Sequence, residues 1–147
     1  MDKLCFHLLT QAPDKKELYD FQEDAGWPRS EVALTKPQDP RARVQWVGIS
    51  RDKRRIAIAR LELAPVTFCF VSELIIRSDC RRKGVGRWFI RNIEQLCLHL
   101  TIPRLLLVAD ASSLPFYERL AFAPDPLVPG YLKKDVSPYR AKVLRTR

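Results

Sequence analysis

A basic run beside two glycines is the part of the sequence best suited to bind an anion. Gly84 and Gly86 stand one residue apart, between an apolar segment and a segment with helical spacing. Glycine lets the backbone turn its N–H groups outward, and a helix N-terminus adds the positive end of its dipole. Cations gather where acidic side chains are normally favoured, namely at Arg81, Arg82, Lys83 and Arg87. We therefore expect a phosphate-bearing ligand here; the alternative is a solvated basic turn.

Two carboxylates stand inside otherwise apolar segments and could serve as a base. Burial of Glu73 or Glu62 would raise the carboxyl pKa toward a useful value. Glu62 can instead pair with Arg60, so Glu73 is the stronger candidate. We interpret His7 and His99, which stand in a strand and late in a helix, as structural residues.

The periodicity of the apolar residues predicts a mixed α/β chain. The expected strands are 3–9, 44–50, 56–64, 66–76, 105–109 and 131–136, and the expected helices are 15–23, 85–100 and 115–120. The strands from 44 to 76 should form a meander, and segment 29–43 a loop with room for one short helix. The helix after strand 66–76 predicts that this strand and 105–109 are parallel, with the ligand at the carboxyl end of the first.

Length and charge are those of one basic domain. The chain has 147 residues and a net charge of +9. We predict a single domain over 1–136 and a partly disordered basic tail over 137–147. We do not expect nucleic acid as a partner, because no basic recognition helix or interleaved aromatic pattern is present. Acidic residues gather early and could receive a cationic amine, although a solvated helix face is the alternative: Asp14, Glu17, Asp20, Glu23 and Asp24.

The cysteines predict neither a metal site nor a disulfide framework. They stand at Cys5, Cys69, Cys80 and Cys97, without a CxxC pair or clustered histidines. Cys80 lies next to the basic run, yet no histidine stands near it in sequence, so we interpret it as unreactive. A reducing cytoplasm is the simplest setting, and no apolar run is long enough to span a membrane.

Two motifs in order resemble the GNAT superfamily of CoA-dependent N-acyltransferases. The first is Arg81-x-x-Gly84-x-Gly86, and the second runs from Asp110 through Phe116-Tyr117-Glu-Arg-Leu to Phe122. The resemblance implies a mostly antiparallel sheet with helices on both faces and a central parallel pair that is splayed at the CoA site. It also implies acetyl-CoA, without a metal, bound by Leu74, Ile75, Ile76, Arg77, Arg81, Arg82, Lys83, Gly84, Val85, Gly86, Arg87, Asp110, Ser113 and Phe116.

The resemblance further implies transfer of an acetyl or similar group to a primary amine by direct attack in a ternary complex. Tyr117 matches the position that protonates the departing thiolate, Glu73 is the candidate base, and a backbone N–H near Ile76 would meet the carbonyl oxygen. The acceptor would be a small molecule or a protein, and the enzyme a monomer or homodimer. Departures at Asp110, Ser113 and Ala121 leave a CoA-binding regulatory or interaction protein as the alternative.

Overall fold

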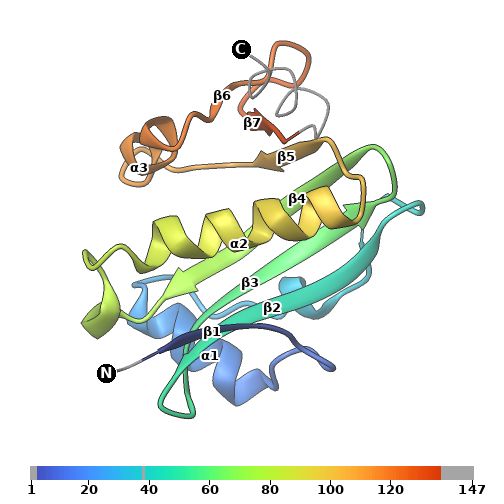
Figure 1. The fold of residues 1–147 in the computed structure, drawn as a ribbon. Coiled ribbons are helices and arrows are strands. Elements are labelled where there is room, and N and C mark those ends of the chain that lie inside the picture. Colours follow the sequence, from blue (N-terminus) through green and yellow to red (C-terminus); the bar gives the residue numbers. More distant parts are fainter. Residues whose placement is uncertain (1–2, 38, 137–147) are drawn as a thin grey trace.

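One seven-stranded sheet organises the part of the chain that the computed structural model describes, residues 3–37 and 39–136 (Figure 1). The strands are β1 (Leu4–Leu8), β2 (Arg43–Arg51), β3 (Arg54–Ala64), β4 (Phe68–Ile76), β5 (Arg104–Leu107), β6 (Ala123–Pro124) and β7 (Leu132–Asp135). Their spatial order is β1-β2-β3-β4-β5-β7-β6, and among them only β4 and β5 pair in parallel. The predicted mixed sheet with a central parallel pair is confirmed.

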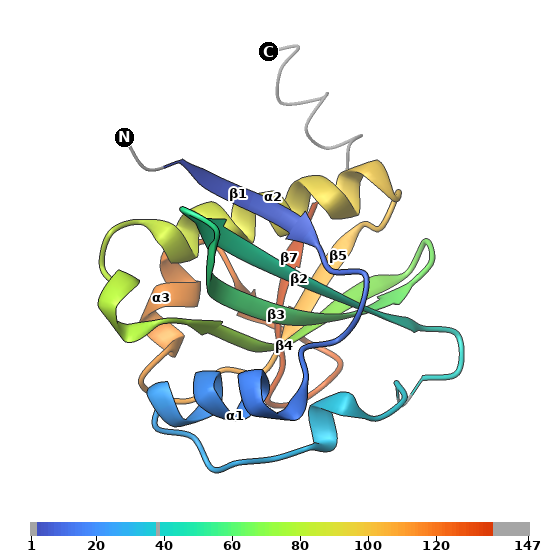
Figure 2. The same ribbon diagram turned by 90° about the horizontal axis from the view of Figure 1, so that it is seen from below.

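Helices cover the two faces of the sheet, as Figure 2 shows with α1 on one side and α2 on the other. They are α1 (Lys15–Asp24), α2 (Val85–His99) and α3 (Leu114–Arg119), with short 3-10 helices η1 (Val32–Leu34) and η2 (Ser78–Cys80). Asp14 begins α1 as predicted, because its side chain accepts a hydrogen bond from the Glu17 amide at 2.8 Å. Both views place α3 beside the N-terminal end of α2.

The apolar periodicity of each helix forms one half of the core. Phe89, Ile93 and Cys97 of α2 are fully buried against one face of the sheet. Leu18 and Phe21 of α1 are buried against the other face, with side chains of β2, β3 and β4. The sheet is therefore held between two apolar layers, which fix the ends of β4 and α2 relative to each other.

Several predicted boundaries differ from the structure. The strand expected from 66 begins at Phe68, because Val66 has φ +61° in the preceding turn. The strand expected to reach 109 ends at Leu107. Neither η2 nor the two-residue β6 was predicted, since segments this short carry no readable period. The predicted tail, 137–147, lies outside the described residues.

The parallel strands separate beyond their first residues. Pairing between β4 and β5 runs from Cys69 with Leu105 to Val71 with Leu107, whereas β4 continues to Ile76. In Figure 1 the segment after β5 runs away from β4 toward α3. Among the described residues, the carboxyl-terminal half of β4 thus has no strand partner on this edge, which agrees with the predicted splay.

A β-bulge lies in this separated part of β4. Arg60 pairs with Ser72 and Ile58 with Ile75, so Glu73 and Leu74 together oppose a single residue of β3. Glu73 has φ +50°, the left-handed region that side chains other than glycine seldom adopt. A bulge shifts the side-chain alternation by one residue. Glu73 consequently lies on the α1 face of the sheet rather than in the α2 core.

Candidate functional site

The turn before α2 presents backbone donors that lack acceptors. Gly84 begins the helix with φ +79°, and Arg82 also has a positive φ, +61°. Within the described residues the amides from Arg82 to Arg87 make no hydrogen bond, while the Trp88 amide donates to the Gly84 carbonyl at 3.1 Å. Outward amides at a helix N-terminus form an anion site. The amides from Arg82 to Arg87, which we call the cradle, therefore have a geometry suited to the predicted phosphate-bearing ligand.

Exposed cations surround these amides. Arg82, Lys83 and Arg87 are exposed and form no ion pair within 3–37 and 39–136. Their charges are available to a ligand that carries several phosphates. Val85, by contrast, is buried in the core, so it offers only its amide.

The Arg81 side chain holds the turn itself. Its Nε donates to the Ile76 carbonyl at 2.9 Å, and one Nη lies 3.9 Å from the Asp24 carboxylate. Asp24 in turn accepts hydrogen bonds from the amide and the hydroxyl of Ser78, both at 2.7 Å. Asp24, predicted as an acid that could receive the acceptor amine, therefore stabilises the turn before α2. Arg81 contributes by holding the neighbouring backbone in place.

The other early acidic residues also have partners in the chain. Asp14 caps α1, Glu17 forms a bidentate ion pair with Arg55, and Glu23 pairs with Arg29. The prediction that this acidic run collects a cationic amine is therefore unsupported for these side chains. They fix α1 and its flanking loops.

Packing, as well as the approach of a ligand, requires a glycine at position 86. A Cβ built there would lie 2.9 Å from Phe116 Cζ and 3.1 Å from Ile76 Cδ1. The absence of a side chain thus lets α3 pack on the first turn of α2 and the end of β4. The two sequence motifs meet at this contact, which brings Phe116 to the first turn of α2.

Only some of the β4 residues that are expected to bind acetyl-CoA direct their backbone groups into the gap beside β5. The Arg77 amide donates to the Ile56 carbonyl at 2.8 Å, and Arg77 Nε donates to the Arg55 carbonyl. Since successive residues of a strand face opposite edges, Ile75 also faces β3, whereas Leu74 and Ile76 face the gap. The amides of Ile75 and Arg77 are thus directed to β3, and contact of these two residues with acetyl-CoA stays a prediction.

Asp110 and Ser113 are bonded to each other. The Asp110 carboxylate accepts from the Ser113 amide at 2.8 Å, the Ser113 hydroxyl at 3.0 Å and the Ser112 hydroxyl at 2.7 Å. The Ser112 hydroxyl and these Ser113 bonds hold the pKa of Asp110 below its ordinary value. These two residues organise the turn that begins α3, and the predicted direct contact of their side chains with a cofactor gains no support.

Tyr117 lies among aromatic rings. Its ring meets Phe116 and Phe122 edge-on, with centroids 5.0 and 5.5 Å away. Burial, with a smaller contribution from the Asp110 charge, raises the pKa of Tyr117 to about 12. Its hydroxyl makes no hydrogen bond within the described residues. A phenol that keeps its proton at neutral pH is suited to donate it.

Glu73 faces a pocket on the opposite side of the parallel pair from the cradle helix. Burial raises the pKa of its carboxyl group, against a hydrogen bond from Gln22 and the charge of Arg60. The pocket has a volume of about 360 Å³ and is bounded by η1 and the following loop, β3, β4, β5 and Tyr131. Its aromatic wall includes Phe70 and Tyr131, whose ring centroids are 5.7 Å apart.

The weaker candidates have other roles. Glu62 pairs with Arg60 at 2.6 Å, the alternative that the sequence offered. The Cys80 thiol is buried, and burial raises its pKa, in agreement with an unreactive group. His99 ends α2. His7 contacts Ser50 Oγ at 2.6 Å.

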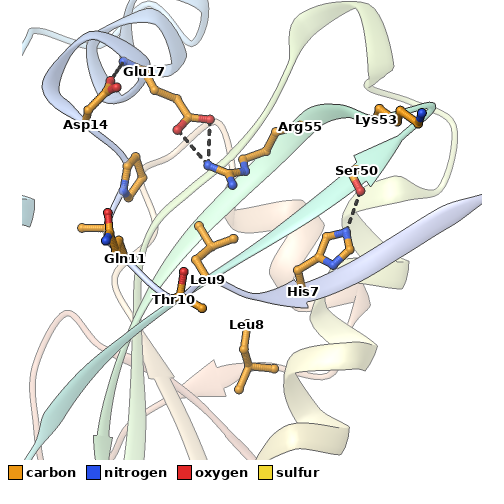
Figure 3. A pocket seen from close by; sticks show the side chains of 12 residues that line it. His7, Leu8, Leu9, Thr10, Gln11, Asp14, Glu17, Ser50, Lys53 and Arg55 are labelled. Carbon is orange, nitrogen blue, oxygen red and sulfur yellow. Dashed lines mark hydrogen bonds and ion pairs between the residues drawn. The ribbon is translucent and has the colours of Figure 1, made fainter.

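His7 borders a second, open hollow of about 710 Å³ between the β1–α1 loop and the β2–β3 hairpin (Figure 3). Figure 3 shows the Glu17 carboxylate directed to Arg55 and the His7 ring directed to Ser50. These polar groups satisfy one another, and neither the cradle nor Glu73 borders this hollow. We therefore place the candidate site at the separated strands.

Within residues 3–37 and 39–136, no three His, Cys, Asp or Glu side chains are grouped so that they could hold a metal ion. None of the described helices is long and apolar enough to cross a membrane.

The comparisons with known proteins agree with this geometry. The profile of the Acetyltransferase (GNAT) family matches residues 12–122, while no curated protein matches the chain. Among solved structures, the ribosomal-protein-S18-alanine N-acetyltransferase from Escherichia coli has a TM-score of 0.72 at 16% identity, covering 92% of this chain and 95% of that one. Tetrahymena GCN5 gives 0.72 at 17% identity, covering 92% and 98%.

A third solved structure contains acetyl-CoA. A GNAT family acetyltransferase from Elizabethkingia anophelis with acetyl-CoA bound gives a TM-score of 0.67 at 11% identity and covers 90% of this chain and 97% of that one. The profile match spans most of the sequence, so the chain belongs to the GNAT family of acetyltransferases. Its general class is that of an acyl-CoA-dependent N-acetyltransferase.

Sequence reasoning missed one polar residue of the site, Gln22, and gave another, Asp24, a different role. Gln22 contacts Glu73, and Asp24 supports the turn at Ser78. Gln22 carried a usable signal, because it stands four residues after Leu18 on the apolar face of α1. A polar side chain in that position requires partners inside the protein. Asp24 carried no comparable signal, since its partner is 54 residues away.

Proposed function

We propose that this protein transfers an acetyl or similar acyl group from acyl-CoA to a primary amine that enters the Glu73 pocket. The observation that carries the proposal is the row of amides from Arg82 to Arg87 that have no acceptor among the described residues, next to the gap between β4 and β5. Acetyl-CoA supplies an activated acyl group as a thioester. The pyrophosphate fits the amides at Gly84, and Arg82, Lys83 and Arg87 balance its charge.

The end of β4 is suited to orient the thioester. Leu74 and Ile76 direct backbone groups into the gap between β4 and β5. The extended pantetheine arm of acyl-CoA can pair with these groups as an additional strand. A backbone N–H at this edge can stabilise negative charge that develops on the carbonyl oxygen. Phe116 packs against Gly86 in the first turn of α2.

Tyr117 and Glu73 divide the proton transfers in this proposal. The amine must lose a proton before it attacks, and Glu73 accepts it directly or through a water molecule, which its raised pKa favours. The leaving thiolate must gain a proton, and Tyr117 holds one at neutral pH. Glu73 belongs to β4 and Tyr117 to α3.

The lining of the Glu73 pocket indicates which kind of acceptor would fit. The pocket combines the Glu73 carboxylate with the rings of Phe70 and Tyr131, which suits an amine attached to an apolar body. A small molecule and a protein amine both meet this description. Cytoplasmic location and a monomer or homodimer remain predictions.

Calorimetry with CoA and acetyl-CoA, followed by a free-thiol assay over a panel of amines, tests the function. We expect binding of both and turnover with at least one amine. Tyr117→Phe should lower kcat by about a hundredfold and leave the Kd of CoA unchanged. Tight CoA binding without turnover on any amine would instead support a CoA-binding regulatory protein, and absence of binding would refute both.

A further inference from the structure

A buried glutamine joins the pocket wall to the candidate base. Gln22 is 1% exposed, and it is one of the few polar side chains buried in the described structure, beside Arg60 and Glu62. Its amide oxygen accepts from the Ser30 amide at 3.0 Å, and its Nε2 donates to the Ser30 carbonyl at 3.1 Å. The same Nε2 donates to Glu73 Oε2 at 3.3 Å.

These contacts connect three parts of the site. Gln22 belongs to α1, Ser30 lies in the loop that leads to η1, and Glu73 occupies the bulge of β4. Val32 and Ala33 of η1 line the same pocket as Glu73. A small movement of the Gln22 side chain would therefore move the wall and the carboxylate together.

We propose that Gln22 is a positioning residue, which fixes the Glu73 carboxylate and the η1 wall of the acceptor pocket in one arrangement. This inference rests on Glu73 being the base of the proposed function. The only side-chain hydrogen bond that Glu73 receives in the described structure comes from Gln22. The two-point pairing with the Ser30 backbone holds the donor in place, so the donor cannot turn away.

Other charged groups also act on Glu73 and must be separated from Gln22. Arg60 lowers the pKa of Glu73, and burial raises it as the largest effect. The remaining charged or titratable side chains that line the pocket are Lys36, Asp39, Glu62 and Tyr131. Asp39 is bonded to Arg41 and Glu62 to Arg60, so these acids are compensated within the chain.

The test compares three variants. Gln22→Met has similar volume but no donor, whereas Gln22→Glu keeps an oxygen for the Ser30 amide and adds a carboxylate beside Glu73. Tyr19→Phe is the matched control, because Tyr19 also joins α1 to this loop, through Glu31 at 2.7 Å, without contacting Glu73. Circular dichroism and CoA calorimetry establish that each variant is folded.

Titration of the Glu73 carboxyl carbon by NMR in the CoA-bound protein is the first measurement, with Glu73→Gln to assign the signal. Loss of a hydrogen bond to a charged group should raise this pKa by about one unit in Gln22→Met. The rise should be larger in Gln22→Glu, since two carboxylates then share the site. Tyr19→Phe should leave the titration unchanged.

The pH profile of kcat/KM for the amine is the second measurement. The acidic limb of the profile should move to higher pH by the same amount as the pKa. For Gln22→Met this lowers kcat/KM at low pH by about tenfold, whereas the plateau at higher pH should change little. An unmoved Glu73 titration in both Gln22 variants, or an equal shift in Tyr19→Phe, overturns the inference. Because the NMR measurement needs no turnover, a protein that proves inactive refutes the proposed function separately.

Discussion

Replacement of Gly86 by alanine tests whether the contact between the two motifs matters for catalysis. The new Cβ would lie 2.9 Å from Phe116 Cζ, and ordinary contact begins at 3.4 Å, so the ring must retreat by 0.5 Å. The overlap costs about 1–3 kcal/mol. Alanine in a helix recovers about 1 kcal/mol relative to glycine. We therefore expect the free energy of unfolding to fall by only about 1 kcal/mol.

The effect on the rate should be larger than the effect on stability. Tyr117 follows Phe116 in α3, so a displaced ring moves the candidate acid. A misplacement of about 1 Å can cost about a hundredfold in rate, and half of that distance should cost about tenfold in kcat. The Kd of CoA should change less than about threefold, because the amides before α2 keep their directions.

Two further variants test whether the contact between Gly86 and Phe116 positions Tyr117. Phe116→Leu in the Gly86→Ala background should restore part of kcat, since the smaller side chain leaves room for the Cβ. Gly84→Ala meets no atom within 4 Å, but its φ of +79° is strained for alanine, so it should weaken CoA binding rather than kcat. Wild-type kcat in Gly86→Ala, or a further loss on adding Phe116→Leu, would show that the contact does not position Tyr117. Steady-state kinetics, calorimetry and urea unfolding supply these values.

Three other changes should have distinct effects. Glu73→Gln should raise the Tm at pH 7 and much less at pH 4, because a carboxyl whose folded pKa is raised destabilises the fold as pH rises from its ordinary pKa toward the raised value; thermal melts at both pH values check this. An equal gain at both pH values would contradict the assignment. Arg82→Gln combined with Lys83→Gln should weaken CoA binding by about tenfold at low salt and less at high salt, as calorimetry can measure, whereas a salt-independent loss would argue against a role of charge. Asp24→Ala should loosen the turn at Ser78 and raise the Kd of CoA by about tenfold, with kcat at saturation unchanged; an unchanged Kd would show that the turn needs no such support.

Much of the site was accessible from sequence because its signals are local. The glycine spacing at 84 and 86 predicted a backbone turn with outward amides, and helical spacing after it predicted a parallel crossover. Both depend on neighbours along the chain, so no tertiary information was needed. The Phe116-Tyr117 segment was recognised for the same reason, as a short contiguous motif.

Tertiary structure decided which atoms face the ligand. The bulge turns Glu73 toward α1, and simple alternation along β4 would have predicted the α2 core for it. Asp24, predicted near the acceptor, instead bonds Ser78 across 54 residues, and Gln22 reaches Glu73 across 51. Contacts this distant in sequence depend on how α1 packs on the sheet, which no local pattern encodes. The sequence by itself determined the longer helices and strands and the glycine turn before α2, and packing determined the directions of the side chains that complete the site.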